Sequence, residues 1–194
     1  MASTSLLVAL RTKVKPITVF ARKNPMLANT ITYAGLGGLA EFTQQVINRR
    51  PGEDFEWRRI WHFTVIGVCF NGPVGHIWYR WLDRFIATGT KMALGKKLLL
   101  DQSICAPTFI VAFYTGMSVL EGQKDILREL RSKFVPTYKA SCCFWSVAQV
   151  FNFLLIPTSL RIVYIASLSF LWTNFLAIMK RRVSRGGRKR QYVR

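Results

Sequence analysis

Polar side chains recur inside the apolar stretches of this 194-residue sequence, where each of them needs a hydrogen-bond partner. Glu41, Gln44 and Gln45 lie three and four residues apart, which places them on one face of a helix. Gln149 and Asn152, three residues apart, likewise share a helix face. Because lipid offers no hydrogen bonds, such side chains either bond to a neighbouring helix or line a water-filled path.

Asp101 lies one turn inside another apolar stretch. An ionisable residue at that depth is costly unless it faces a partner or water. Arg161 and Arg84 are candidate partners for it. Glu41 has the same requirement, and we interpret it as facing an aqueous or polar central path. For all these residues the sequence leaves two roles open, contact between helices and lining of a pore.

Patterns typical of catalysis or metal binding do not occur in the sequence. It contains no Ser-His-Asp spacing, phosphate-binding loop, dinucleotide fingerprint, CxxC pair or HExxH pattern. Three of the four cysteines lie inside or at the edge of apolar stretches, as buried free thiols do. We therefore expect no enzymatic activity, no catalytic residue, no cofactor and no metal site.

The apolar stretches are the elements that must position these side chains. They cover residues 27–47, 60–82, 98–120 and 141–179, and a helix needs about 20 residues to cross a bilayer. Gly72-Pro73 interrupts the second stretch, where we expect a kink or a break. The last stretch is too long for one span and is divided at Pro157, so a fifth span stays open. The predicted fold is all-α, a membrane helical bundle of about four spanning helices with surface or partly inserted helices.

The connecting segment between the third and fourth stretches has its own pattern. Apolar residues at helical spacing predict an amphipathic surface helix within residues 121–139. With four spans, both ends of the chain lie on the same side of the membrane, whereas a fifth span moves the tail across.

Basic residues are concentrated at both ends of the chain, which has 28 Lys and Arg against 9 Asp and Glu. We divide the chain into a basic N-terminal arm or targeting segment (1–26), a membrane helical bundle (27–180) and a basic disordered tail (181–194). The acid-free arm is similar to a mitochondrial presequence in composition. The expected partner is the lipid bilayer, with anionic lipid at the basic ends, and no direct DNA binding is expected.

Four clusters of residues form a pattern with fixed order and spacing. They comprise Gly72, Pro73, His76, Trp78, Tyr79, Asp83 and Arg84; Lys96, Lys97, Asp101, Gln102 and Pro107; Trp145, Gln149, Asn152, Phe153, Pro157 and Arg161; and Trp172 and Lys180. The run Gln-x-x-Asn-Phe-x-x-x-Pro-x-x-x-Arg is the most specific part. The pattern resembles the Mpv-seventeen and peroxisomal-membrane-protein-twenty-two family, and is nearer to its Mpv-seventeen-like proteins. The chain departs from that family at Glu41, Cys142, Ser146 and Ala177.

The resemblance implies a function. It implies a pore or channel-like protein of the mitochondrial inner membrane, or alternatively of the peroxisomal membrane, which affects small-solute passage, reactive oxygen and organelle DNA maintenance. A second reading of the resemblance is a membrane scaffold or assembly factor, for example for the mitochondrial ribosome. Association into a homo-oligomer is compatible with both.

Overall fold

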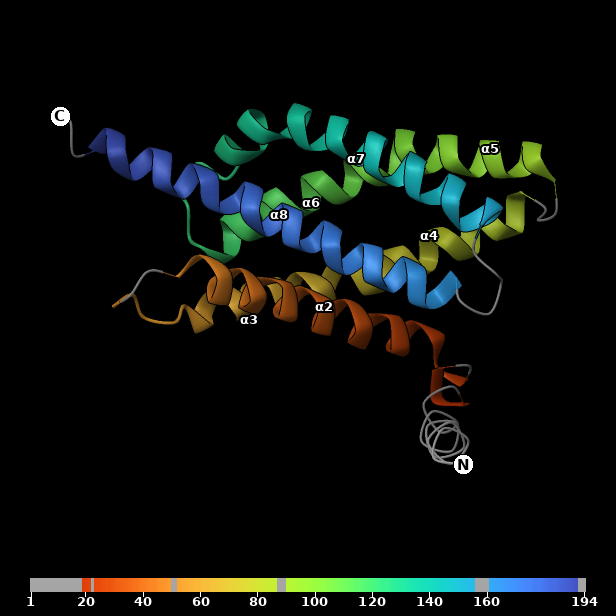
Figure 1. Ribbon diagram of the computed structural model, residues 1–194, viewed down its shortest axis with the longest axis horizontal. Helices are drawn as coiled ribbons and strands as arrows, with labels where there is room; N and C mark the ends of the chain where they lie inside the picture. Colours follow the sequence, from red (N-terminus) through yellow and green to blue (C-terminus); the bar gives the residue numbers. More distant parts are fainter. Residues whose placement is uncertain (1–18, 22, 50–51, 87–89, 156–160, 192–194) are drawn as a thin grey trace.

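The computed structural model describes residues 19–21, 23–49, 52–86, 90–155 and 161–191. These residues form helices and turns, and no strand is found among them, which confirms the all-α prediction. Five long helical segments run back and forth along one axis (Figure 1). As a result, α2 begins at the end of the bundle opposite to the end at which α8 finishes.

Each segment is long enough to traverse the bundle. The five segments are α2 (Pro25–Asn48); α3 (Trp57–Ile66) with η1 (Gly67–Asn71) and α4 (Gly72–Phe85); α5 (Lys91–Leu100) with η2 (Asp101–Cys105) and α6 (Ala106–Leu120); α7 (Arg128–Leu154); and α8 (Arg161–Gln191). The elements η1 and η2 are single π-helical turns, in which the backbone hydrogen bonds span five residues instead of four.

Each π-helical turn is followed, after one residue, by a proline. Pro73 follows η1 and Pro107 follows η2. A proline inside a helix removes one backbone donor, and its ring clashes with the carbonyl group four residues earlier. The wider π turn gives the ring room, so the helix continues past it. The break expected at Gly72-Pro73 is therefore replaced by a continuous helix that contains a bulge.

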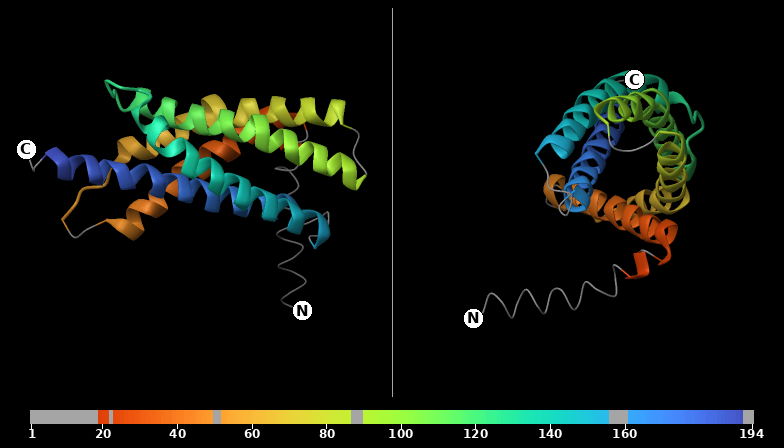
Figure 2. Two further views of the ribbon diagram at one scale, coloured as in Figure 1. Left: turned by 90° about the horizontal axis from the view of Figure 1, so that it is seen from above. Right: turned by 90° about the vertical axis from the view of Figure 1, so that its right-hand side faces the viewer.

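The five segments close into a ring. Helix α2 packs on α3, η1 and α4 and also on α8; α8 packs on α7, α7 on α6, and α6 on α3. A view along the bundle shows the helices arranged around a common interior (Figure 2, right). Every segment consequently has one face towards this interior and one face towards the outside.

Large apolar side chains are exposed on the outer face of all five segments. Examples are Leu39, Val46, Ile47, Trp61, Ile77, Phe85, Leu99, Val111, Val119, Val147, Val150, Leu171 and Ile178. By length and composition alone, one helix in the described ranges, Gly95–Leu120, is apolar enough to cross a membrane. Helix α2 is less apolar on average because it also carries Glu41, Gln44 and Gln45, and the structure buries all three.

The C-terminal third differs from the expected arrangement. Helix α7 begins at Arg128 and continues to Leu154 with Pro136 inside it, so the surface helix expected within 121–139 is part of a longer helix. Helix α8 then runs the length of the bundle and continues to Gln191, through most of the tail expected to be disordered. Arginine and lysine have high helix propensity, which favours this continuation. Pro157 lies outside the described residues.

The contact between α2 and the second segment is unusually close because it is made through glycines. A Cβ atom on Gly67 would lie 2.5 Å from the carbonyl oxygen of Tyr33 and 2.7 Å from the Cα atom of Ala34. A Cβ atom on Gly72 would likewise collide with the backbone of Thr30. Small residues allow this backbone approach, which is a common basis of helix association in membranes.

The substitution Gly67→Ala should therefore destabilise the protein by roughly 1–3 kcal/mol, because α2 has to move away from η1. Gly35→Ala is the matched control, since a Cβ atom there meets nothing within 4 Å. We expect thermal unfolding in detergent to show a lower midpoint for Gly67→Ala alone. Equal midpoints for the two variants would contradict the close contact.

Candidate functional site

A cavity of about 450 Å³ lies inside the ring, and residues from all five helical segments line it. Its walls are mainly apolar and aromatic, with contributions from Tyr33, Phe109, Trp145 and Trp172. Polar groups are few. Enclosed, mostly apolar cavities with a small number of polar groups are typical of sites for small molecules.

Asp101 supplies a carboxylate to the wall of this cavity. The indole Nε1 of Trp78 donates a hydrogen bond to Oδ1 of Asp101, at 3.1 Å. The side chains of Tyr79 and Cys105 also form hydrogen bonds with this carboxylate. The sequence suggested Arg161 or Arg84 as partners; the described partners are neutral and Arg84 is not among them, while the side chain of Arg161 lies outside the described part of the structure.

The two π-helical turns border the cavity. Asp101 and Cys105 are the first and last residues of η2, and Asn71 is the last residue of η1; all three line the cavity. A π bulge changes the direction of the side chains that follow it, and such bulges are frequent at functional sites. The two prolines therefore act on the site indirectly, by placing a bulge on each of two neighbouring segments.

An ion pair lies on the lining of the cavity. The Nζ atom of Lys97 is 2.6 Å from Oδ1 of Asp83, and the Asp83 side chain is 66% exposed. The contact joins the end of α4 to α5, the helix that follows it in the chain. Asp83 is thus neutralised by a lysine from the next helix.

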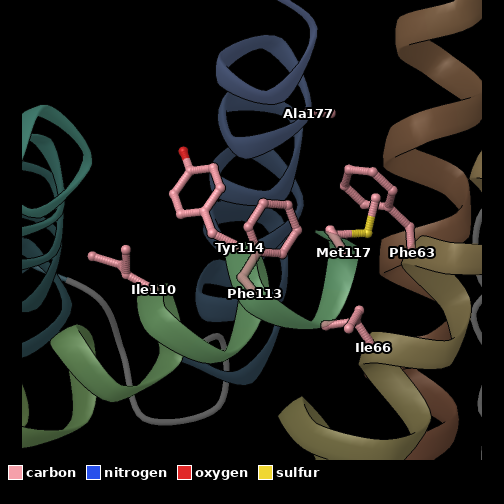
Figure 3. Packing of buried hydrophobic residues seen from close by; sticks show 7 residues of the cluster. All are labelled: Phe63, Ile66, Ile110, Phe113, Tyr114, Met117 and Ala177. Atoms are coloured by element: carbon pink, nitrogen blue, oxygen red, sulfur yellow. The ribbon is translucent and has the colours of Figure 1, made fainter. Parts of the chain in front are cut away.

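A cluster of apolar side chains forms part of the cavity wall and continues past it. It consists of Phe63, Ile66, Ile110, Phe113, Tyr114, Met117 and Ala177, which come from α3, α6 and α8 (Figure 3). We call this set the apolar cluster. Phe63, Ile66, Ile110 and Phe113 also line the cavity, whereas Tyr114, Met117 and Ala177 do not. Met117 and Ala177 have no exposed surface.

Next to the apolar cluster lies a group of charges, which we call the charged end layer: the buried Glu129, Lys133 and Lys180 and the partly exposed Glu121. Lys180 has no exposed surface, and its Nζ atom is 2.7 Å from Glu129 and 2.9 Å from Glu121. Lys133 lies 3.4 Å from Glu129 and donates to the backbone oxygen of Lys180 at 3.1 Å. The layer therefore fastens α8 to the start of α7 and to the turn before it.

The pKa values of this layer follow from its burial and its charges. Glu129 and Lys133 precede the apolar part of α7. Burial by itself raises the pKa of Glu129, but the hydrogen bond and charge of Lys180 outweigh it, so this pKa lies below its usual value. Burial lowers the pKa of Lys133 to about 8, against the opposing charge of Glu129.

The polar residues of α2 lie at this same end of the bundle. Glu41 is 3.2 Å from Nε of Arg59, and the Nε2 atom of Gln44 donates to Asn174 on α8 at 2.9 Å. Gln45 exchanges hydrogen bonds with the backbone of Glu56. Of the two roles that the sequence left open, these three side chains perform the contact between helices, and none of them lines the cavity.

The predicted residues thus separate into two groups. Asp101, Gln149, Trp145 and Trp172 line the cavity, whereas Glu41, Gln44 and Gln45 do not and contact α3, α8 and the connection before α3 instead. The cavity wall therefore contains only part of the predicted polar set. The side chains of Asn152, Phe153 and Arg161, and the whole of Pro157, lie outside the described part of the structure. Gln102 is buried, and its backbone oxygen accepts a hydrogen bond from Tyr138.

Several residues of the site were not singled out from the sequence. Tyr33, Cys105, Ser169 and Thr173 line the cavity, and the partners in the charged end layer were not anticipated. Ordinary core residues have the same types and spacings, so the sequence held no signal for the first group. An isolated acid such as Glu129 close to apolar positions could have indicated a buried partner.

Removing one partner from the charged end layer should be strongly destabilising. Lys180→Met leaves Glu129 buried without its shortest ion pair, at a cost of about 3–5 kcal/mol. Lys124→Met is the matched control, because Lys124 is exposed in the neighbouring turn. Denaturant unfolding in detergent should separate the two variants. A cost below about 1 kcal/mol, as exposed ion pairs show, would contradict the buried network.

Comparison with known proteins agrees with this architecture. The sequence model of the Mpv17 / PMP22 family matches residues 118–177. The Mpv17-like protein of Xenopus laevis is 34% identical over 163 residues, which cover 84% of this chain and 80% of that protein. No solved structure matches the chain.

The names of two further relatives state the membrane to which each belongs. The mitochondrial inner membrane protein Mpv17 of Danio rerio is 32% identical over 162 residues, 80% of this chain and 89% of that protein. Peroxisomal membrane protein 2 of Bos taurus is 28% identical over 163 residues, 80% of this chain and 83% of that protein. The resemblance noted in the sequence is confirmed. Because these matches extend over most of both chains, this chain belongs to the Mpv17 / PMP22 family of membrane proteins.

Proposed function

We propose that this chain is a pore-type protein of an organelle membrane, and that the cavity inside the ring is part of a path for small solutes. The observation that carries the proposal is the cavity itself, enclosed by five helical segments with apolar outer faces. Inside it, the acid Asp101 and the amide Gln149 face a common space. Polar residues of membrane helices mark solute paths more often than they mark catalysis.

All five segments cross the membrane in this proposal, instead of four. Helix α2 has 24 residues, or about 36 Å at 1.5 Å per residue, and α8 has 31 residues. Both exceed the roughly 30 Å of a bilayer core. An odd number of crossings places the basic N-terminal arm and the basic end of α8 on opposite sides, where each meets a different layer of anionic lipid.

We interpret the structure as a closed state of such a pore. In this proposal Tyr114, Met117 and Ala177, the members of the apolar cluster that do not line the cavity, close the way from the cavity to the charged end layer. The hydroxyl groups of Tyr114 and Thr137 are hydrogen-bonded to each other at 2.9 Å. A narrow passage lined by apolar groups excludes water and thereby blocks ions. Opening therefore requires the apolar side chains on α3, α6 and α8 to separate.

The mitochondrial inner membrane is the proposed location, with the peroxisomal membrane as the alternative. One relative is named for each of these membranes. The absence of acidic residues from positions 1–26 favours the mitochondrion, because presequences have that composition. In this setting the protein would influence metabolite supply, and through it reactive oxygen and organelle DNA maintenance.

A scaffold or assembly role is the second candidate. The observation that favours it is the helical continuation of α8 to Gln191, which presents Arg and Lys residues beyond the bundle. Such a helix suits anionic lipid or the RNA of a mitochondrial ribosome. Deleting residues 181–194 should then abolish low-salt co-sedimentation with ribosomes, whereas a pore would keep its conductance. Neither candidate assigns a catalytic step or a cofactor to the chain.

Conductance of the purified protein in planar bilayers tests the pore. Met117→Ser should increase the fraction of time in the open state, because a hydroxyl group in the apolar cluster lets water enter. Val119→Ser is the control on the same helix, since Val119 is 59% exposed on the outer face. Thermal unfolding should first show that both variants remain folded. No conductance from any of the three proteins, across salts and voltages, would contradict the proposal.

A further inference from the structure

We propose that the cavity binds small organic cations that carry an aromatic or similarly apolar group, with Asp101 as their counter-ion. The proposal names a class of solute for the cavity. As an assignment of what crosses the membrane it rests on the proposed function, but the binding itself can be measured without transport.

The carboxylate of Asp101 has only neutral partners among the side chains that the structure describes. They are the indole of Trp78 and the side chains of Tyr79 and Cys105. No Lys, Arg or His whose side chain is described lies within ion-pairing distance of it, and the side chain of Arg161 is outside that set. A carboxylate removed from water is costly without an opposite charge, so this site favours a cation from outside the chain.

The other charged residues on the described cavity wall are Lys97 and Asp83. Lys97 lies one helical turn before Asp101, and its ammonium group could have served as the counter-ion. Its Nζ atom is instead 2.6 Å from Asp83. The charged residues among those that line the cavity are Asp83, Lys97 and Asp101. Because the first two neutralise each other, one negative charge is left on the described part of the wall.

The rest of the cavity wall is rich in aromatic rings. Tyr33, Tyr79, Phe109, Trp145 and Trp172 all line the cavity. An aromatic face attracts a positive charge through its quadrupole, most strongly in tryptophan, and the same ring packs against apolar groups. Both parts of an organic cation therefore find a complementary surface here. The volume of about 450 Å³ is in the range of small-molecule sites.

An organic cation fits this cavity better than a metal ion or an anion does. Metal ions need several oxygen, nitrogen or sulfur ligands, and the described residues contain no group of three His, Cys, Asp or Glu side chains that could hold one. An anion would be repelled by Asp101. A neutral apolar molecule would fit the walls but would leave the carboxylate uncompensated.

Three probes of similar shape test the proposal: 2-phenylethylamine, which is a cation at neutral pH, 2-phenylethanol, which is neutral, and 3-phenylpropanoate, which is an anion. Binding to the full chain in lipid nanodiscs is measured by calorimetry and by tryptophan fluorescence, with empty nanodiscs subtracted. Trp145 and Trp172 on the wall, and Trp78 beside Asp101, make the fluorescence a local signal. We expect the cation to bind about tenfold more tightly than the alcohol, which corresponds to about 1.4 kcal/mol, and the anion most weakly.

Variants separate the role of Asp101 from general partitioning. Asp101→Asn should reduce the preference for the cation over the alcohol to less than about twofold, because it removes the charge and keeps the shape. Asp54→Asn, in the exposed connection between α2 and α3, should keep the full preference. If Asp101→Asn fails to fold, the comparison of the three probes on the unaltered chain still decides the question.

Two results would overturn the proposal: equal binding of the cation and the alcohol to the unaltered chain, or an undiminished preference in folded Asp101→Asn. The pore is tested independently by conductance. Conductance without a cation preference in binding would remove this site and leave the pore. A cation preference in a protein that never conducts would leave the site and remove the pore.

Discussion

The interior of a bilayer offers no hydrogen-bond partner, and this constraint accounts for where the polar side chains of this protein lie. Gln44 bonds to Asn174, Glu41 pairs with Arg59, and Lys180 holds Glu121 and Glu129. Every one of these contacts joins different segments of the ring. The ring is the arrangement that lets five helical segments turn polar side chains towards one another and large apolar side chains outward.

The sequence predicted the helices better than it predicted their partners. The segment 27–47 corresponds closely to α2, because apolar periodicity and a length near 20 residues are local properties. It also indicated that Glu41, Asp101 and Gln149 point inward. It did not indicate that Asp101 bonds to Trp78, or that Glu41 pairs with Arg59, because those partners depend on how the segments pack. Packing is settled by glycine contacts such as Gly67 on Tyr33, which involve residues far apart in the chain.

The prolines account for a second difference: the helices predicted to be interrupted are continuous in the structure. A sequence with Gly72-Pro73 and Pro107 predicts interrupted helices, since proline lacks a backbone donor. In the ring each of these helices is packed against neighbours, and each continues past its proline after one π-helical turn. The same two turns carry Asn71, Asp101 and Cys105 to the cavity. The same π-helical turns therefore accompany the prolines and carry residues of the cavity wall.

The contact between α2 and α8 has a consequence for biogenesis. Gln44 and Asn174 are separated by 130 positions, so the ring can close only after almost the whole chain has been made. Until α8 is made, the acids Glu121 and Glu129 lack their partner Lys180. We expect a chain that lacks its last helix to be less stable and to be degraded faster than the full chain.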